Sequence, residues 1–353
     1  FWATPCNRGC SIKANYQSTT VHLPPALATG NLDIITDAMV ASILTDQTGK
    51  ARGVSFIDKK TGRDHQIKAR IVVLAASAME SVRVLFNSRT AQHRDGVGNS
   101  SGLLGKYIMD TVGATLAGRV PILENLPPHN EEGASGAHIY VPWWLYKEQA
   151  AGKLDFPRGY HIEMAGSRQM PNARTFGNLE QLSGIGYGRR LKEEARRYYG
   201  SIVAHGGRGE MIPNKDCYVE LDPKVKDRWG IPVLRFHWKW SEYEYRQAAH
   251  MQKTFAEIIT TMGGTPGRID PTGREAIAEG GRIIHEVGGA MMGVKRETSV
   301  TNRHSQCWDA PNVYVTDGAS FCSNSDKNPT LTIMALAWRA ADHMMDEMKR
   351  GNL

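Results

Sequence analysis

The sequence predicts a protein of mixed α/β and α+β class, in which parallel strands and helices are combined with an antiparallel sheet. Three observations support this prediction. Residues 71–77 read IVVLAAS, a continuous apolar run of strand length, and residues 78–88 follow with the periodicity of a helix. Residues 32–70 contain short strand-like segments separated by glycine-containing turns. Residues 235–240 alternate aromatic and basic side chains, as a strand with one apolar face does.

The first part of the chain is expected to form a β-meander. Its predicted strands are LDIIT (32–36), VASILTD (40–46), ARGVSFID (51–58) and HQIKAR (65–70), with turns QTGK and KKTGR between the later ones. The run at 71–77 lacks alternation, which is typical of a strand covered on both faces, and a strand followed by a helix is the signature of a parallel sheet.

The later elements follow the same rules. In the segment at 235–245, Phe236, Trp238 and Trp240 alternate with basic residues. An ordinary half-buried strand is the simpler interpretation, and the wall of a sugar or aromatic pocket is the alternative. We then expect a helix at 241–262, a strand within 312–320 and a helix from 329 onward.

Composition excludes several classes of protein. The chain has 353 residues, 41% of them apolar, and a formal charge of +7 that is dispersed along the sequence. The basic cluster at 188–200 also contains two glutamates, as a solvated helix face does, so we expect no nucleic-acid partner. No run of 18 apolar residues predicts a membrane span, and the start of the chain has neither an initiator Met nor a signal-peptide pattern.

Cysteine usage gives little information about chemistry. Five cysteines are an odd number, and only Cys6 and Cys10 lie close together, so a disulfide scaffold is excluded. Half of a metal or disulfide cluster at Cys6 and Cys10 is the alternative, but with two cysteines we expect no metal. The redox compartment cannot be read from these residues.

The stretch IIHEVGGAMMG, residues 283–293, contains an isolated histidine, His285, before a run of glycine and methionine. A zinc-protease helix would need a second histidine four positions on, where Gly289 stands. A phosphate-binding loop would need a lysine after the glycines, and the G-x-G-x-x-G fingerprint is found nowhere in the chain. A lone histidine in apolar company is more often a core residue, so the spacing alone leaves its role open.

A second cluster of polar residues precedes the last helix. Asn328 is expected at the N-cap and Pro329 at the first helical position, and the free N–H groups of this helix start form an anion site. Upstream, a strand ends at Asp317 and Gly318, where a carboxylate can face a ligand at the carboxyl edge of a sheet. The apolar face of the helix is predicted to consist of Leu331, Met334, Ala337, Ala341 and Met345.

The blocks HEVGGAMMG, SVTN, CWDAPNVYVTDGASF and NPTLTIMALAWRAADHM, within residues 285–345, resemble the C-terminal signature of the glucose-methanol-choline (GMC) family of flavin-dependent oxidoreductases. Residues 23–88 are similar to the middle segment of the family, and residues 207–244 resemble the substrate-domain strands of its bacterial sugar and gluconate dehydrogenase-like branch. The order of the blocks is that of the family.

The resemblance implies two domains. Residues 1–115 and 280–353 would form a discontinuous, partial FAD-binding domain with a doubly wound sheet, and residues 116–279 a substrate-binding domain with an antiparallel sheet. The family begins with a glycine-rich turn that binds the flavin pyrophosphate, and this sequence has none. We therefore expect that a large N-terminal portion is missing, which puts flavin binding by this chain alone in question.

The family chemistry implied for this chain is oxidation of an alcohol, of a sugar or polyol, by hydride transfer to N5 of FAD. His285 matches the family's base, which takes the hydroxyl proton. Asn328 matches the second active-site position and would hydrogen-bond the substrate oxygen, although an asparagine before proline also commonly caps a helix. The glycines after His285 would let the backbone pass close to the flat flavin ring.

The resemblance also implies cofactor contacts at eight positions. Val40 matches the position whose backbone meets the adenine, Ala75 and Ala76 match a strand end along the dinucleotide, and Thr330 would bring N–H groups to the flavin pyrimidine edge. The remaining predicted contacts are Asp317, Gly318, Asn328 and Pro329.

Three matters stay open at this point. The electron acceptor could be a quinone, a cytochrome or oxygen, and an oxidase of the same fold is therefore one alternative. An inactive fragment, or one that needs a partner, is another. The resemblance favours the periplasm, and the sequence itself does not determine the location.

Overall fold

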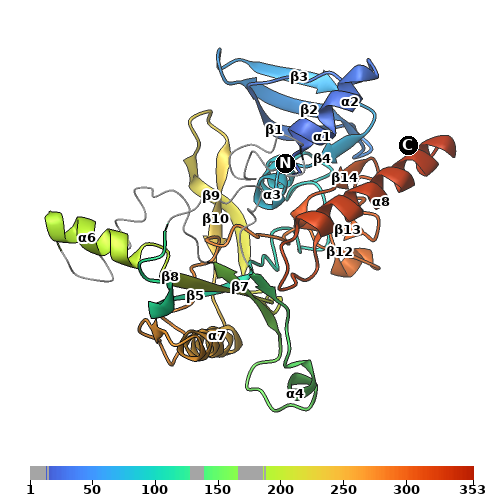
Figure 1. Cartoon of the computed structure of the whole chain (residues 1–353). Coiled ribbons are helices and arrows are strands. Elements are labelled where there is room, and N and C mark those ends of the chain that lie inside the picture. The colour runs from blue at the N-terminus through green and yellow to red at the C-terminus, as the bar shows by residue number, and fades with distance from the viewer. Residues whose placement is uncertain (1–12, 14–15, 128–138, 166–185, 187) are drawn as a thin grey trace. The chain divides into compact units, whose positions relative to one another are not determined.

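The structure is a computed structural model that describes residues 13, 16–127, 139–165, 186 and 188–353. The chain divides into two compact units, whose elements are labelled in Figure 1. Unit 1 consists of Phe1–Ile34, Gly113–Arg208 and Glu242–Ile277, and unit 2 of Ile35–Val112, Gly209–Ser241 and Ala278–Leu353. Cys6 and Cys10 lie outside the described residues.

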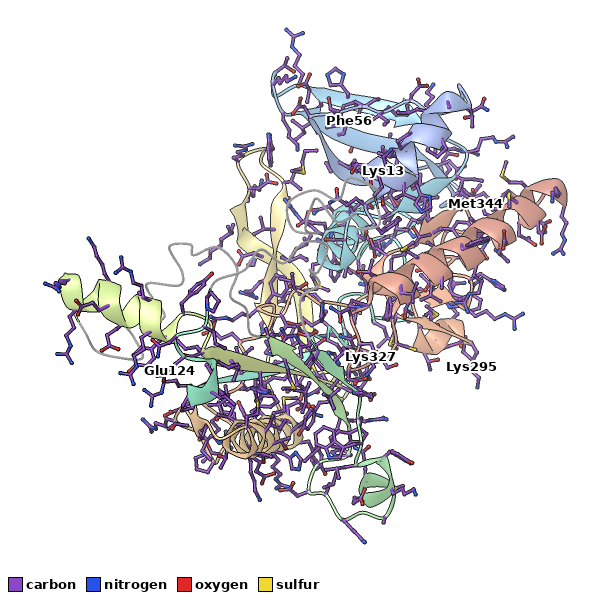
Figure 2. The ribbon with its side chains drawn as sticks, viewed as in Figure 1. Lys13, Phe56, Glu124, Lys295, Lys327 and Met344 are labelled. Carbon is purple, nitrogen blue, oxygen red and sulfur yellow. The ribbon has the colours of Figure 1, made fainter. Side chains whose placement is uncertain are left out.

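Unit 2 contains the predicted meander as a three-stranded antiparallel sheet of order β1-β2-β3. The strands are β1 (Ala38–Thr45), β2 (Ala51–Asp58) and β3 (Asp64–Lys68). Phe56, labelled in Figure 2, lies on β2. It is paired with His65 on β3, and their rings stack with centroids 5.3 Å apart. The strand predicted at 32–36 is wrong, since Ile34 and Ile35 are half exposed and the first strand begins only at Ala38.

The predicted strand–helix pair of the parallel layer is also present in unit 2. Strand β4 (Val72–Leu74) pairs in parallel with β14 (Val313–Val315), and helix α3 (Ala78–Asn87) follows β4. The strand is shorter than the apolar run, and only one face of it is covered: Val72 and Leu74 are buried, whereas Val73 is 46% exposed. The prediction of burial on both faces is therefore wrong for the described residues.

Helix α3 is joined to the antiparallel hairpin of β9 (Tyr218–Lys226) and β10 (Pro232–His237) by a buried arginine. The guanidinium of Arg83 lies 2.5 Å from the carboxylate of Asp227 and donates to the carbonyl oxygens of Ile231 and Pro232. Because a planar guanidinium has five N–H donors, one side chain can satisfy all three acceptors.

The aromatic segment at 235–240 does not form one continuous strand face. Strand β10 ends at His237, so Trp238 and Trp240 lie beyond it. Trp240 is buried and donates its indole N–H to the carbonyl oxygen of Ala278, whereas Phe236 is 54% exposed. The alternation therefore predicted the strand but gave the wrong face, because the strand ends at His237 and Phe236 borders a cavity.

The rest of unit 2 is short elements and one long helix. Helix α8 (Thr330–Lys349) was predicted, but its inward face was not: Leu331 is 78% and Met345 51% exposed, and Ala340 is its buried residue. The predicted stripe is rotated from the covered face because Ala and Met recur all around this helix. The short elements are β12 (Met292–Gly293), η3 (Arg296–Thr298), β13 (Thr301–Asn302) and η4 (Gly318–Ser320).

Unit 1 is built on a five-stranded sheet of order β11-β5-β8-β7-β6. Helix α7 (Glu242–Thr261), which was predicted, buries Met251, Phe255 and Ile259. A Cβ on Gly118 of β5 would lie 2.6 Å from Ile259, and one on Gly207 of β8 would lie 2.4 Å from Met251, so glycine at both positions permits the helix to approach the sheet. The strands are β5 (Val112–Arg119), β6 (Ile139–Val141), β7 (Tyr160–Ala165), β8 (Ile202–Gly209) and β11 (Thr265–Pro266).

Small elements complete unit 1. They are α1 (Ser18–Val21), α2 (Leu23–Ala28), η2 (Pro121–Leu123), α4 (Tyr146–Ala150) and α6 (Arg189–Tyr198). Within the described part of the chain, none of the helices has the length and apolar character needed to cross a bilayer.

The mixed fold class is confirmed by these sheets and helices. The two units differ from the boundaries drawn from sequence, since residues 1–34 belong to unit 1 and residues 209–241 to unit 2. The assignment of a cofactor-binding and a substrate-binding domain stays a prediction, because the two units are defined by contacts within the chain and not by bound ligands.

Candidate active site

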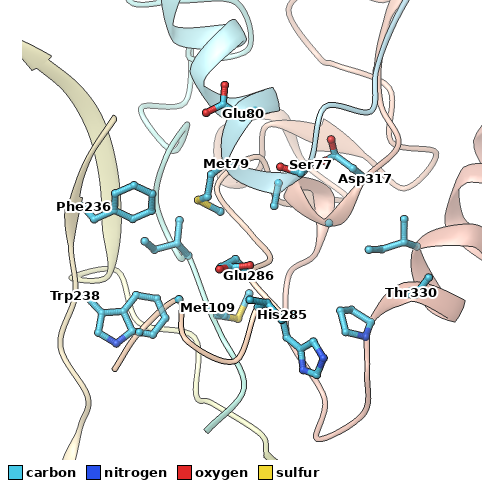
Figure 3. A pocket seen from close by; sticks show the side chains of 18 residues that line it. Ser77, Met79, Glu80, Met109, Phe236, Trp238, His285, Glu286, Asp317 and Thr330 are labelled. Atoms are coloured by element: carbon cyan, nitrogen blue, oxygen red, sulfur yellow. The ribbon is translucent and has the colours of Figure 1, made fainter. Parts of the chain in front are cut away.

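Unit 2 contains a cavity of about 650 Å³. Six segments contribute to it: the start of α3, residues 108–109, the end of the β9–β10 hairpin, residues 280–286, residues 317–318 and the start of α8 (Figure 3). Its lining residues are Ser77, Ala78, Met79, Glu80, Ile108, Met109, Phe236, Trp238, Gly280, Gly281, Ile284, His285, Glu286, Asp317, Gly318, Pro329, Thr330 and Ile333. A hollow of this size is typical of sites for small molecules and cofactors.

His285 lies at this cavity with hydrogen-bond partners at both ring nitrogens. Its Nδ1 is 3.1 Å from Oγ1 of Thr111, and its Nε2 is 3.3 Å from Nδ2 of Asn328. The imidazole is therefore oriented by two side chains instead of being packed into an apolar core. Of the two interpretations left open by the sequence, the structure favours a histidine displayed at a cavity.

Asn328 does not cap the last helix. Helix α8 begins at Thr330, its N-cap is Pro329, and no side chain makes a cap hydrogen bond there. The first helical bond runs from the N–H of Ile333 to the carbonyl oxygen of Pro329. The side-chain amide of Asn328 therefore contacts His285. The N–H groups of the first turn of α8 have no acceptor within the helix, and this turn borders the cavity.

A second helix begins at the same cavity. Ser77, the N-cap residue of α3, has a φ of +75° and no side-chain cap bond, and both it and Ala78 line the hollow. A helix N-terminus carries about half a positive charge from its aligned peptide dipoles. The free N–H groups at the starts of α3 and α8 favour an anionic or electron-rich part of a ligand next to them, whereas the carboxyl groups of Glu80, Glu286 and Asp317 line other parts of the cavity.

The wall next to His285 combines apolar side chains with one carboxyl group. Met79, Met109 and Phe236 project toward the hollow, and the carboxyl group of Glu286 lies among them (Figure 3). Burial raises the pKa of Glu286 above its ordinary value. The cavity therefore offers ring and thioether surfaces together with a polar group.

Asp317 reaches the cavity, but both of its carboxylate oxygens have partners inside the protein. One accepts the hydroxyl of Ser81 on α3, and the other accepts the N–H of Ala319 at 2.9 Å. Burial raises the pKa of Asp317, and these hydrogen bonds oppose only part of that effect. The side chain thus fixes the turn before η4 against α3, and Gly318 beside it borders the hollow.

The structure brings only some of the predicted residues together. His285, Asp317, Gly318, Pro329 and Thr330 line the cavity, and Asn328 touches His285. The other three predicted cofactor positions are absent from the cavity wall, and their roles stay predictions: Val40 on β1, and Ala75 and Ala76 between β4 and Ser77.

The glycines after His285 are close to other parts of the chain. Gly288 and Gly289 are buried with φ of +88° and +90°. A Cβ on Gly288 would lie 2.2 Å from the carbonyl oxygen of Tyr107, and one on Gly289 would lie 2.9 Å from the side chain of Val82. Glycine is therefore required at these positions by the backbone of Tyr107 and the side chain of Val82, and a close approach to a flat ring stays a prediction.

Sequence comparison identifies the family of this chain. Two sequence profiles described as GMC oxidoreductase match it, an N-terminal one over residues 3–127 and a C-terminal one over residues 213–337. The chain belongs to the GMC oxidoreductase family. The resemblance drawn from the sequence blocks is thereby confirmed, and the C-terminal match includes His285 and Asn328.

Curated relatives of this GMC chain include dehydrogenases and oxidases. A 2-methyl-1,2-propanediol dehydrogenase from Mycolicibacterium austroafricanum is 33% identical over 92% of this chain and 56% of its own length. The fructose dehydrogenase large subunit of Gluconobacter japonicus is 26% identical over 90% and 55%, respectively. The gluconate 2-dehydrogenase flavoprotein of Pantoea cypripedii is 27% identical over 97% and 56%. The chain thus spans about half the length of these relatives.

Solved structures confirm the fold. A formate oxidase from Aspergillus oryzae, described in a study of FAD modification, superposes with a TM-score of 0.64 at 14% identity and covers 94% of this chain and 63% of its own. An FAD-dependent oxidoreductase from Chaetomium thermophilum gives a TM-score of 0.54 at 15% identity, over 94% and 65%.

Sequence reasoning missed three residues next to His285. Asp110 and Thr111 lie in a stretch that showed no regular pattern, and Asn324 lies in the polar loop before α8. All three contact His285 or its backbone. The one available signal was an Asp-Thr pair directly after the apolar residues of "YIM" at 107–109, and it is weak. Among the described residues, no group of three or more His, Cys, Asp or Glu side chains is arranged to hold a metal ion.

Proposed function

We propose that this chain forms the alcohol-oxidising site of an FAD-dependent oxidoreductase that acts on CH–OH groups of a sugar or polyol. The observation that carries the proposal is the pair of His285 and Asn328, whose side-chain nitrogens are 3.3 Å apart beside a cavity of about 650 Å³. A titratable nitrogen and a non-titratable amide at one point are suited to take a proton and to hold an oxygen.

The cavity fits FAD by the chemistry of its lining. Two helix N-termini, at Ala78 and Thr330, border the hollow, and neither has a side-chain cap that would satisfy its N–H groups. FAD has a pyrophosphate and an electron-rich pyrimidine edge, both of which favour such donors. When bound, FAD supplies the acceptor for the hydride that leaves the carbinol carbon.

The residues of this chain handle the proton. His285, as a neutral imidazole, takes the hydroxyl proton of the alcohol at Nε2. The alcohol then replaces Asn328 as the partner of Nε2, and the amide of Asn328 donates its hydrogen bond to the substrate oxygen instead. General-base catalysis of this kind contributes about 10²–10⁴-fold to a rate. The proposed cofactor contacts are Asp317, Gly318, Asn328, Pro329 and Thr330, and further along the dinucleotide Val40, Ala75 and Ala76.

The substrate class is supported by the wall and by the relatives. Phe236 and Trp238 offer ring faces for the C–H surface of a sugar or polyol, and the carboxyl group of Glu286 offers hydrogen bonds to its hydroxyls. Names of relatives such as fructose dehydrogenase and gluconate 2-dehydrogenase fit this class.

For the electron acceptor, we propose a quinone or cytochrome, because the three relatives described above are named dehydrogenases. The alternative is oxygen, since other relatives are named oxidases, for example a paromamine 6'-oxidase from Streptomyces fradiae and a pyranose 2-oxidase from Lyophyllum shimeji. The rate at which the reduced protein is reoxidised in air-saturated buffer distinguishes the two.

The proposal is tested on the protein that carries this chain by adding FAD and then mixing the complex anaerobically with a panel of polyols, sugars and simple diols. We expect FAD to be bound and its absorbance to be bleached by at least one member of the panel. Failure to bind FAD would support the alternative of an inactive or partner-dependent fragment. Binding without bleaching by any alcohol would overturn the proposed reaction.

A further inference from the structure

A buried carboxylate anchors the loop that carries His285. Asp110 is fully buried, and its carboxylate accepts backbone N–H groups from Thr111 at 2.7 Å, Gly281 at 3.0 Å, Ile283 at 3.3 Å and His285 at 3.1 Å. An ionised carboxylate has about four lone-pair sites, so these four donors can satisfy it without a cationic side chain. Asp110 therefore holds the loop through its backbone.

The anchored loop contains a strained residue. Ile284 has a φ of +61°, in the left-handed region that β-branched residues rarely adopt, and its side chain is 78% exposed. Burial therefore does little to hold it in this conformation. The two residues on either side of it both donate their N–H groups to Asp110, and such strain persists only where the surroundings fix it. The turn through Ile284 aims the next side chain, that of His285.

The hydroxyl of Thr111 meets the imidazole from the other side. Its Oγ1 lies 3.1 Å from Nδ1 of His285 and 3.4 Å from Nδ2 of Asn324, which is also 3.3 Å from the carbonyl oxygen of His285. The amide nitrogen of Asn328 faces Nε2, and an amide N–H can only donate. Nε2 is then the acceptor, so Nδ1 carries the proton and donates it to Thr111.

The two lone pairs of the Thr111 hydroxyl suffice for these contacts. One accepts the Nδ1–H of His285 and the other the Nδ2–H of Asn324. The hydroxyl thus selects one of the two neutral tautomers of the ring. In that tautomer Nε2, next to Asn328, is the basic nitrogen.

We propose that Asp110 and Thr111 are a positioning pair for His285: the carboxylate fixes the strained turn at Ile284, and the hydroxyl sets the Nδ1–H tautomer, so that Nε2 takes the substrate proton. Neither residue lines the cavity, so both act through His285. The role of Nε2 as the atom that takes the substrate proton rests on the proposed function, whereas the tautomer of the ring can be observed without catalysis.

The experiment is NMR of the full chain with selectively ¹⁵N-labelled histidine, in which His285→Asn identifies the signals of His285. We expect a protonated-type Nδ1 and an unprotonated-type Nε2 at a pH where the ring is neutral. Thr111→Val keeps the β-branched shape and removes the hydroxyl. In this variant the two ring-nitrogen signals of His285 should move toward each other, because both tautomers become populated. Thr111→Ser is the matched control that restores the hydroxyl and should return the original pair of signals.

The anchoring role is tested by hydrogen exchange at the amides of Ile283 and His285. In Asp110→Asn we expect exchange to accelerate about tenfold or more, because a hydrogen bond to a charged acceptor is lost. Unchanged exchange would overturn the role of Asp110. If Asp110→Asn does not fold, the exchange of the Ile283 and His285 amides is measured in Thr111→Val. The carboxylate of Asp110 remains in that variant, so both amides should stay protected. Loss of their protection would contradict the claim that Asp110 holds the loop independently of the Thr111 hydroxyl.

Failure of this inference and failure of the proposed function can be distinguished. A mixed or Nε2–H tautomer in the unmodified chain, or one that Thr111→Val leaves unchanged, overturns the positioning pair. Normal reduction of bound FAD in His285→Ala overturns the catalytic role of His285 instead, and it does so whatever the tautomer. In the protein carrying this chain, Thr111→Val should slow FAD reduction by about 10²-fold or more, with rescue by Thr111→Ser.

Discussion

Nε2 of His285 lies 3.3 Å from Nδ2 of Asn328, although the two residues are 43 positions apart in the chain. His285 follows a strained turn, and Asn328 precedes the long helix α8. Each position alone has an ordinary structural explanation, as a core histidine or as a helix cap. Their meeting at a cavity, in a chain that belongs to the GMC oxidoreductase family, gives both residues a chemical role in the account proposed here.

Removal of the Asn328 amide should affect the reaction and not the fold. Since the side chain makes no cap bond to α8, we expect Asn328→Ala to change the free energy of unfolding by less than about 0.5 kcal/mol. Loss of its hydrogen bond to the substrate oxygen should slow FAD reduction by about tenfold. Urea unfolding and anaerobic stopped-flow measurements check the two effects.

Ser323→Ala, at an exposed serine of the same loop, is the control for Asn328→Ala and should change neither quantity. The opposite outcome for Asn328→Ala, a loss of about 1 kcal/mol of stability with an unchanged rate, is what a helix cap would give. That result would remove Asn328 from the site.

Ile284→Gly should stabilise the folded chain. A left-handed conformation costs a β-branched residue about 1–3 kcal/mol, whereas glycine adopts it freely at an entropic cost of about 0.5–1 kcal/mol. Little burial is lost, because the side chain is 78% exposed. We expect a net gain of about 1 kcal/mol in urea unfolding. Ile122→Gly, also at a highly exposed isoleucine but without a positive φ, should not be stabilising.

Arg83→Met should destabilise the chain by about 3 kcal/mol, because it leaves the largely buried carboxylate of Asp227 without a cationic partner. The double variant Arg83→Met/Asp227→Asn should be less destabilised than the sum of the two single variants. Arg189→Met is the matched surface control. Its ion pair with Glu193 is exposed, and its loss should cost less than about 0.5 kcal/mol. Equal effects at Arg83 and Arg189 would contradict the importance of the buried arginine.

The stability that depends on Asp317 should fall as the pH rises. Burial raises the pKa of Asp317 above its ordinary value of 3.8, so the folded chain holds this proton more tightly than the unfolded chain. Its contribution is complete below pH 3.8 and is lost as the pH rises through the folded pKa. The free energy of unfolding of the unmodified chain minus that of Asp317→Asn should decrease as the pH rises above 3.8. A difference that is constant or increases with pH would contradict this.

Long elements with a clear period could be predicted from sequence. Helices α3, α7 and α8 and the meander were found because their apolar spacing or turn residues are local signals. Burial was predicted less well. Val73 and Leu331 have the apolar character of covered residues but are exposed, since what covers an element is decided by distant parts of a chain.

The site could be predicted only in part. His285 and Asn328 were singled out by their sequence blocks, but nothing in the sequence says that their side chains meet. Asp110 was missed because it acts on backbone N–H groups, which every residue offers and no motif marks. The contact of Gly288 with the backbone of Tyr107 could not be predicted, because a positive φ needs glycine whatever the close neighbour is.

The most direct test of the central claim is the reduction of bound FAD in His285→Ala of the protein that carries this chain. We expect that the variant still binds FAD, with its normal flavin absorbance, and that an alcohol which bleaches the unmodified protein bleaches the variant about 10²–10⁴-fold more slowly. A rate within about tenfold of the unmodified protein would contradict the claim that His285 is the base.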